Sequence, residues 1–295
     1  MERSETQVTP KVLPAVALHV TEYGDRDSPT HLLFVHGFPD DQRMWEPVVA
    51  ELPQDWHVVT YDVRGAGRST RPRETQHYRT ELLVEDLVAV LDATLPKGAR
   101  VHLVGHDWGS TAMWEVVGAE TSDHRLRDRL ASYTSASGPP LDHLGDQTAT
   151  WRGRVRMLPQ TLHSSYVGLF LLPWLPEQLW TRGQWLAHTV ARRLDPTIDL
   201  LPWGDVVTHD AVCSLNLYRA NVPSRLRHPR PWRTTVPVQL VIATRDAWVT
   251  PLALRGLEAR CSDLTRVEVD EGHWLPRARP AEFAGLVADF VREHL

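Results

Sequence analysis

Residues 101–109 read Val101-His102-Leu103-Val104-Gly105-His106-Asp107-Trp108-Gly109. An apolar, β-branched run that leads into a glycine-flanked turn predicts a strand that bends sharply into a helix. This is the arrangement that exposes a nucleophile at the carboxyl end of a strand. The residue at the nucleophile position is Asp107. The stretch therefore predicts an α/β fold in which a carboxylate, rather than a hydroxyl or thiol, makes the attack.

An aspartate at this position limits the chemistry to a few classes. Its carboxylate needs no base to remove a proton, because the unperturbed pKa of aspartate is about 3.9. A carboxylate can displace a good leaving group from an sp³ carbon, as in a strained epoxide or an alkyl halide, and form an alkyl ester. Hydrolysis of that ester then requires a histidine that activates water and a second carboxylate that orients the histidine.

Two later residues match those requirements in the expected order of nucleophile, acid and histidine. Asp246 follows the apolar run 238–245, and His273 follows the run 266–269. Both are predicted at the carboxyl edge of the sheet, where open α/β folds place their sites. Asp246 has an alternative role as a cap for the helix predicted near Pro251.

A second turn supplies candidates for stabilising an oxyanion. His36-Gly37-Phe38-Pro39 follows the predicted strand 31–35. In folds with this nucleophile turn, one backbone N–H comes from such a loop and another from the residue after the nucleophile. The amides of Phe38 and Trp108 are therefore predicted to form an oxyanion hole. Phe38, Trp108 and Trp274 are also expected to contact the substrate.

Short apolar, β-branched runs predict the strands of the sheet. They are residues 15–20, 31–35, 57–63, 101–105, 131–135, 238–243 and 266–269. Residues 78–95 carry leucines and valines at helical spacing, and a further helix is predicted directly after Asp107. Strands that alternate with helices favour a mostly parallel sheet with helices on both faces.

Residues 138–228 interrupt this pattern with many prolines and tryptophans. We expect an inserted helical cap here, between the strands 131–135 and 238–243, on an α/β core of residues 1–137 and 229–295. The alternative is an independent second domain. The cap is favoured because the last two strands and a final helix still have to complete the sheet.

The composition is typical of a globular protein. The 295 residues are 42% hydrophobic and 23% charged, with a net charge of -5, so no basic footprint for nucleic acid is present. No apolar run is long enough to form an integral membrane segment, and the polar start lacks the layout of a signal peptide, so we expect a cytoplasmic protein. Cys213 and Cys261 are too few for a disulfide framework or a zinc site, and neither a metal nor a cofactor is predicted.

These motifs together resemble the α/β-hydrolase-fold epoxide hydrolases. That family carries His-Gly-X-Pro, Gly-X-Gly-X-Ser, Gly-His-Asp-Trp-Gly and a late Gly-His, and residues 65–69 and 272–273 supply the second and the last of these. Residues 63–69 and 135–139 are most similar to bacterial domains that are sometimes fused to a short-chain dehydrogenase, a second domain that we do not expect here. The resemblance also implies a cis peptide bond between Phe38 and Pro39.

The resemblance assigns two tyrosines in the cap, which in the family donate hydrogen bonds to the epoxide oxygen as the ring opens. Tyr218 lies in Asn-Leu-Tyr-Arg, which matches the family's Asn-X-Tyr-Arg motif. Tyr166 matches the other pattern, Tyr-X-X-X-Phe-Gln-X-Pro, except that Leu171 replaces the glutamine. For each tyrosine the alternative is a packing role inside the cap.

The resemblance implies hydrolysis of small-molecule, lipophilic epoxides to vicinal diols through an alkyl ester on Asp107, by a monomer or a homodimer without a cofactor. The main alternative is a haloalkane dehalogenase, in which the Trp108 indole would hold the halide. Dehalogenases usually carry asparagine or glutamate in place of Phe38 and do not need paired tyrosines. A ligand receptor without turnover is the alternative of another class, and the complete set of Asp107, Asp246 and His273 argues against it.

Overall fold

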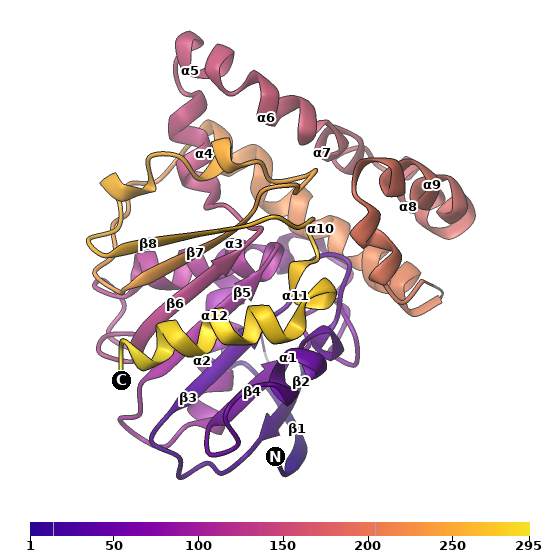
Figure 1. Cartoon of the computed structure of the whole chain (residues 1–295). Coiled ribbons are helices and arrows are strands. Elements are labelled where there is room, and N and C mark those ends of the chain that lie inside the picture. The colour runs from indigo at the N-terminus through magenta and orange to yellow at the C-terminus, as the bar shows by residue number, and fades with distance from the viewer. Residues whose placement is uncertain (14, 204) are drawn as a thin grey trace.

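One sheet forms the centre of the molecule (Figure 1). The structure is a computed structural model, and it describes residues 1–13, 15–203 and 205–295. Within these residues the sheet has eight strands, in the order β1-β2-β4-β3-β5-β6-β7-β8. Their bounds are β1 Arg3–Val8, β2 Leu18–Tyr23, β3 His31–Val35, β4 His57–Tyr61, β5 Val101–His106, β6 Leu130–Ala136, β7 Val238–Ala243 and β8 Leu264–Val269.

The mostly parallel sheet predicted from the sequence is confirmed. Strands β3 to β8 run parallel to one another, whereas β2 pairs antiparallel with β4, and β1 pairs antiparallel with β2 at the edge of the sheet. The largest differences from the prediction are in β1 and β2, and other bounds shift by one or two residues. Strand β1 was not predicted, because five of its six residues are exposed and polar. The strand predicted over 15–20 is β2, which begins at Leu18 and continues to Tyr23.

Helices cover both faces of the sheet, and the alternation of side chains along β3 shows how. Leu33 and Val35 belong to the core under α2 (Thr80–Thr94) and α3 (Trp108–Ala119). Leu32 and Phe34 point to the opposite face and pack under α1 (Glu46–Ala50) and α12 (Pro280–Arg292). Because both faces are buried, β3 is a continuous apolar strand rather than an alternating one.

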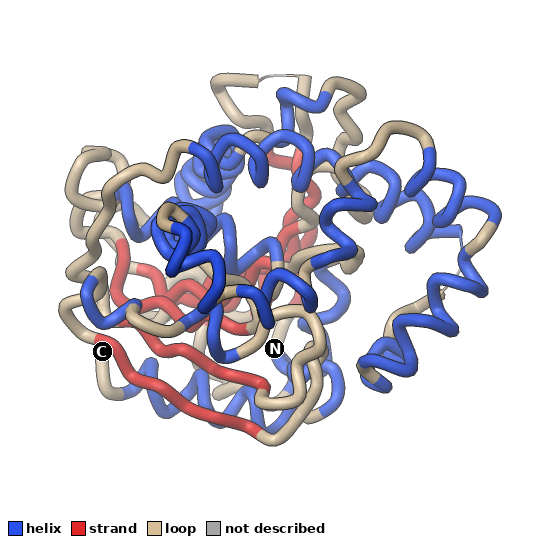
Figure 2. The backbone as a smooth tube through the Cα atoms, turned by 90° about the horizontal axis from the view of Figure 1, so that it is seen from above, coloured by secondary structure: helices blue, strands red, loops and turns tan. Residues whose placement is uncertain are grey.

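The described residues between β6 and β7 form helices joined by loops, and they add no strand to the sheet. The helices are α4 Leu141–Thr148, α5 Trp151–Arg156, α6 Leu158–His163, α7 Ser165–Phe170, α8 Leu175–Arg182, α9 Gln184–Leu194, the 3₁₀ helix η3 Pro196–Leu200 and α10 Asp205–Arg227. Figure 2 shows this segment lying over the strand ends when the molecule is seen from above. Among the described residues, no helix combines the length and apolar character needed to cross a membrane.

Short helices complete the core. They are η1 Gln42–Trp45, η2 Thr75–Tyr78, η4 Pro251–Leu254, η5 Leu257–Ala259 and α11 Leu275–Ala278.

A buried ion pair fixes the loop after β4. Arg64, in this loop, places its guanidinium 2.5 and 2.6 Å from the carboxylate oxygens of Asp86 on α2. Both side chains are fully buried. The same guanidinium donates to the carbonyls of His77 and Leu82, so four of its five N–H donors are used within the protein.

Candidate active site

Asp107 lies at the sharp turn between β5 and α3, as predicted. Its backbone is left-handed, with φ 52° and ψ -122°, a conformation that is costly for a residue with a side chain. The small neighbours make the turn possible. A Cβ on Gly109 would lie 2.2 Å from the carbonyl oxygen of Val35, so only glycine lets α3 start this close to β3. The turn directs the Asp107 carboxylate away from the sheet.

The structure brings the three predicted residues together at the carboxyl edge of the sheet. His273, after β8, has Nε2 3.6 Å from Oδ2 of Asp107. Its Nδ1 donates to Oδ2 of Asp246, after β7, at 2.9 Å. The other oxygen of Asp246 accepts the backbone N–H groups of Trp248 and Val249. Asp246 therefore stabilises its own loop and orients the histidine at the same time.

The charges around His273 shift its pKa strongly. Burial of the imidazole acts to lower the pKa, but the Asp246 carboxylate and, next, the Asp107 carboxylate outweigh burial and raise it to about 10. The pKa of Asp246 is lowered, because His273 and the two loop N–H groups more than offset its burial. The electrostatics of the site therefore favour the imidazolium form of His273.

The loop after β3 reaches the other side of Asp107. The N–H of Phe38 donates to Oδ1 of Asp107 at 2.5 Å, and the peptide bond from Phe38 to Pro39 is cis. A Cβ on Gly37 would lie 2.3 Å from that Oδ1 and 2.4 Å from the amide nitrogen of Trp108. The structure thus places the amide nitrogens of Phe38 and Trp108 beside the Asp107 carboxylate, with Phe38 donating to it, and their role as an oxyanion hole stays a prediction.

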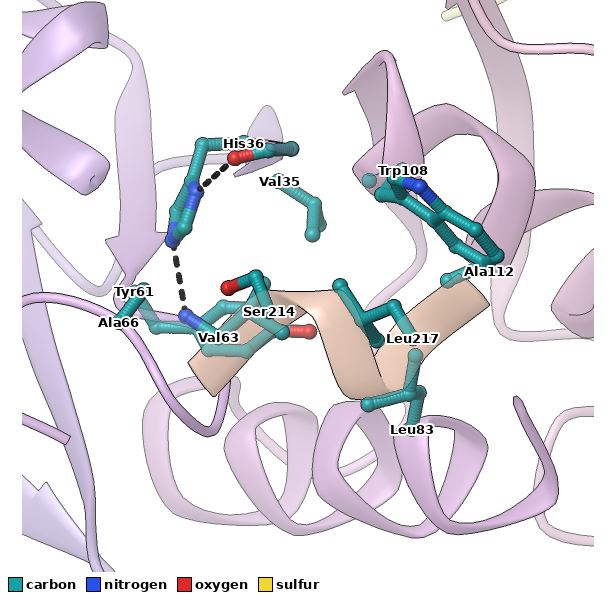
Figure 3. Close-up of a pocket in the computed structure, with 12 residues that line it drawn as sticks. Val35, His36, Tyr61, Val63, Ala66, Leu83, Trp108, Ala112, Ser214 and Leu217 are labelled. Carbon is teal, nitrogen blue, oxygen red and sulfur yellow. Dashed lines mark hydrogen bonds between the residues drawn. The ribbon is translucent and has the colours of Figure 1, made fainter. Parts of the chain in front are cut away.

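His36 holds this loop in place. Its Nε2 accepts the N–H of Val63, so the proton is on Nδ1, which donates to the carbonyl of Gly37 at 3.0 Å. Figure 3 shows His36 and Trp108 on opposite sides of a small cavity beneath the loop. The cavity is about 10 Å³, too small for a substrate. The histidine is therefore structural, and the space for substrate lies elsewhere.

A larger cavity of about 220 Å³ lies above Asp107, and both predicted tyrosines line it. Tyr218 comes from α10 and Tyr166 from α7, with ring centroids 6.2 Å apart. The Trp108 ring packs 4.8 Å from that of Tyr218. Burial raises the pKa of both phenols well above its usual range, and the nearby charge of Asp107 raises it further. Both hydroxyls are therefore protonated at neutral pH.

Trp274 and Phe38, which were predicted to contact the substrate, lie beside the cavity rather than in its wall. The Trp274 indole donates to Asp40 at 3.0 Å, and its ring packs against that of His273. The Phe38 ring packs edge-on against Tyr218, with centroids 5.4 Å apart. In this structure both side chains support other site residues, and contact with a substrate stays a prediction.

The fold agrees with comparisons to known proteins. A model of the α/β hydrolase fold family matches residues 30–276, which is most of the chain. The chain belongs to this family. A crystal structure of a Bacillus megaterium epoxide hydrolase in complex with an inhibitor has the same fold, with a TM-score of 0.74 and 23% identity over 94% of this chain and 97% of that one.

Curated relatives give closer matches. "Probable oxidoreductase EphD" of Mycobacterium tuberculosis is 34% identical over 289 residues, which are 94% of this chain but 48% of that protein. The chain thus spans about half the length of that relative. "Epoxide hydrolase 4" of Mus musculus is 33% identical over 300 residues, which are 93% of this chain and 76% of that protein. The resemblance to α/β-hydrolase-fold epoxide hydrolases is therefore confirmed.

Two residues that hydrogen-bond to the backbone of His273 were not predicted from the sequence. Asp195, buried between α9 and η3, accepts the backbone N–H of His273 at 2.7 Å. The Nε2–H of His106 donates to the carbonyl of His273 at 2.8 Å. Burial and the nearby His273 lower the pKa of His106 to about 4, so it is neutral. The backbone of the histidine is therefore held on both sides.

The loop that carries Asp246 is tied to the inserted helices in a similar way. Gln160 on α6 accepts the N–H of Thr250 at 2.8 Å and donates to the carbonyl of Trp248 at 2.9 Å. His163, one turn later, donates to the carbonyl of Ala247. Only Asp195 had a signal in the sequence, since Asp-Pro-Thr is typical of a helix N-cap. No sequence pattern near Asp195 indicated that its second carboxylate oxygen accepts the N–H of His273.

Proposed function

We propose that the protein is an epoxide hydrolase that converts lipophilic epoxides to vicinal diols through an alkyl ester on Asp107. One observation carries the proposal. A carboxylate held in a left-handed turn faces a histidine–carboxylate pair, while two protonated tyrosines line the same cavity. The cavity supplies space for a substrate, and its mostly apolar wall favours lipophilic compounds.

In the first step, Asp107 attacks an epoxide carbon and the C–O bond of the ring breaks. The developing alkoxide needs a proton donor, which Tyr166 and Tyr218 provide. Their raised pKa keeps both phenols in the donating form. The product of this step is a hydroxyalkyl ester of Asp107. His273 is not required for it, because the nucleophile is already ionised.

In the second step, water attacks the ester carbonyl. As an imidazolium, His273 cannot accept the proton of that water. Esterification removes the charge of Asp107, which is one of the causes that hold the histidine pKa near 10. The pKa then falls, so the imidazolium releases its proton, which by way of water restores the phenol that donated in the first step. The neutral His273 then accepts a proton from the attacking water. The amides of Phe38 and Trp108 hold the tetrahedral oxyanion. When the intermediate collapses, the bond between the carbonyl carbon and the alkyl oxygen breaks, the proton on His273 passes to that oxygen, and the diol leaves while the Asp107 carboxylate is restored.

We further propose that residues 138–228 act as a cap on a core of residues 1–137 and 229–295. The position of both tyrosines on the inserted helices supports this division. The cap closes the cavity over Asp107 and excludes bulk water from the first step. The cytoplasmic location, the monomeric or dimeric state and the independence from cofactors stay predictions.

The test separates the two half-reactions. The His273→Ala variant is exposed to aryl and long-chain epoxides and, separately, to bromoalkanes, and intact-protein mass spectrometry follows the adduct. A mass gain equal to the whole epoxide, mapped to Asp107, is the expected result. A gain of an alkyl group without its halogen would instead support a dehalogenase. If neither class forms an adduct, the proposal is wrong and a receptor without turnover is favoured.

The tyrosines give an independent readout. Replacing Tyr166 or Tyr218 with phenylalanine removes the proton donor but keeps the ring that packs in the cavity. General acid catalysis contributes about 10²–10⁴-fold in such steps, so ester formation from an epoxide should slow by that order. Attack on a bromoalkane needs no such donor and should change little. Equal loss with both substrates would point to a packing role for the tyrosines.

A further inference from the structure

The inserted helices α5 and α6 carry an apolar stripe that faces solvent. Trp151, Val155, Leu158 and Leu162 recur at the i, i+4, i+7 and i+11 positions of almost continuous helix, so they share one side. Their exposed fractions are 70%, 64%, 54% and 64%. Helices of globular proteins normally bury this side. Here the orientation is reversed, because the stripe points away from the core.

Helix α9 repeats the pattern. In this helix, all of which the structure describes, no residue is buried. Trp185, Leu186, Val190 and Leu194 are all exposed, and Trp174, just before α8, is 67% exposed. Figure 1 shows α5 to α9 as an outermost row of helices, beyond the end of the sheet. We call the exposed apolar residues of α5, α6 and α9, together with Trp174, the outer cap face.

The charge of this row is opposite to that of the whole protein. Residues 149–194 contain six arginines and one glutamate, a net charge of +5, whereas the chain carries -5. The one glutamate, Glu177, is paired with Arg219 at 2.6 Å, and Arg192 on α9 is paired with Asp199 at 2.9 Å. No carboxylate of the described residues pairs with Arg152, Arg154 or Arg156, which lie between the apolar positions of α5. The outer cap face is therefore both apolar and positively charged.

The same helices reach the substrate cavity from their other side. Met157, Gln160 and Thr161 line the cavity, while Leu158 and Leu162 face outward. Thr161 both lines the cavity and is exposed to solvent. Whatever covers the outer cap face would therefore sit next to residues that line the cavity.

We propose that the outer cap face binds the surface of an anionic lipid membrane, with the tryptophans and leucines in the interfacial layer and the arginines at the headgroups. Exposed tryptophan, leucine and arginine on helices that lie flat are typical of interfacial binding. A second copy of the chain fits less well. A symmetric contact would place the three arginines of α5 against the same face of the partner, whose charge is also positive.

The test measures co-sedimentation with sucrose-loaded vesicles, and it does not depend on the proposed reaction. Vesicles of phosphatidylcholine alone are compared with vesicles that contain about 30% phosphatidylglycerol, a typical anionic lipid. The wild type should sediment with the anionic vesicles and be released by about 0.5 M sodium chloride, which screens surface charges. Each arginine near an anionic surface contributes about fivefold, so replacing the three arginines of α5 with glutamine should weaken binding roughly a hundredfold.

Two further variants complete the design. Serine at Trp151, Leu162, Trp174 and Trp185 removes apolar side chains and should also weaken binding. The matched control replaces Arg73, Lys97 and Arg127, three exposed cations of the core, with glutamine and should bind like the wild type. Unchanged thermal midpoints verify that each variant is folded, since all these side chains are exposed.

Three outcomes would overturn the proposal. The wild type could stay in the supernatant with anionic vesicles. The core control could lose as much binding as the arginine variant, which would mean that only net charge matters. Finally, the serine variant could convert a dimer into a monomer in analytical ultracentrifugation and keep its vesicle binding, which would make a second copy the occupant of this face.

Discussion

Replacing Asp195 with asparagine should slow ester hydrolysis selectively. The carboxylate accepts the N–H of His273 at 2.7 Å with one oxygen. Its other oxygen accepts the N–H and the hydroxyl of Thr197 at 2.9 and 2.5 Å. Asparagine has one oxygen, so its NH₂ group must face the backbone N–H of either His273 or Thr197, and an N–H group cannot accept a hydrogen bond. The variant keeps the size of the side chain and replaces one of the two carboxylate oxygens, which accept from His273 and from Thr197, by an NH₂ group.

The size of the effect follows from the hydrogen bonds lost. A hydrogen bond to a charged group contributes about 1.5–3 kcal/mol, and a buried donor left without a partner costs about 1–3 kcal/mol. We expect the free energy of unfolding to fall by about 2 kcal/mol. If all of this energy holds the histidine loop in its working position, hydrolysis slows at most roughly 30-fold, since 1.36 kcal/mol is tenfold in rate. Ester formation does not use His273 and should change by less than about twofold.

The assay is a single-turnover experiment by rapid quench, with the ester on Asp107 measured by intact mass. The Asp195→Asn variant should accumulate this ester, whereas the wild type should not. Asp199→Asn is the matched control, because Asp199 lies on the same 3₁₀ helix but pairs with His188 and Arg192 rather than with His273. The reasoning would be refuted if both half-reactions slowed equally, or if the control accumulated ester to the same extent.

Three more experiments test the charge on His273, the loop at Gly37 and the buried ion pair of Arg64. The pKa of His273 is raised to about 10 in the folded protein, so its pairing stabilises the fold fully below about pH 6.5, the unfolded pKa, and this stability is lost as pH rises through about 10. Urea unfolding from pH 6 to 10.5 should show this loss in the wild type but not in His273→Gln. Parallel stability curves for the two proteins would contradict the prediction. Gly37→Ala would place a Cβ against the Asp107 carboxylate, so the free energy of unfolding in urea should fall by about 1–3 kcal/mol. Adduct formation on Asp107 should also slow, and an unchanged rate of adduct formation would show that the Cβ does not crowd the carboxylate. Arg64→Ala leaves the buried charge of Asp86 unpaired and should lower the free energy of unfolding by about 3–5 kcal/mol; a loss below about 1 kcal/mol, typical of an exposed pair, would show that the pair is not dry.

The sequence predicted best those features that are encoded locally. The turn at Asp107 follows from the glycines around it, and the positions of Asp246 and His273 follow from the strands that precede them. Strand β1 was missed for a physical reason. Its residues are polar and exposed, and they form a strand because β2 offers a free edge for pairing. That cause lies in the partner strand and not in the residues of β1.

The role of Asp195 shows a different limit. Its first oxygen makes the local hydrogen bonds of a helix cap, which a sequence pattern can indicate. Its second oxygen binds His273, far along the chain, and that contact depends on how the inserted helices pack on the core. Local patterns carry no information about such packing. The same holds for Gln160, which looks like an ordinary polar residue of a helix.

The hydrogen bonds of Asp195 and Gln160 give the inserted helices a second role, which is to position two loops of the candidate site. Asp107, Asp246 and His273 all lie on the core, so the insertion could be regarded as a cover alone. However, Asp195 holds the backbone of His273, and Gln160 holds the loop that follows Asp246. Both loops leave the edge of the sheet and depend on the insertion for part of their hydrogen bonding. The insertion is therefore part of the frame that positions the acid and the histidine, in addition to supplying the tyrosines that line the cavity.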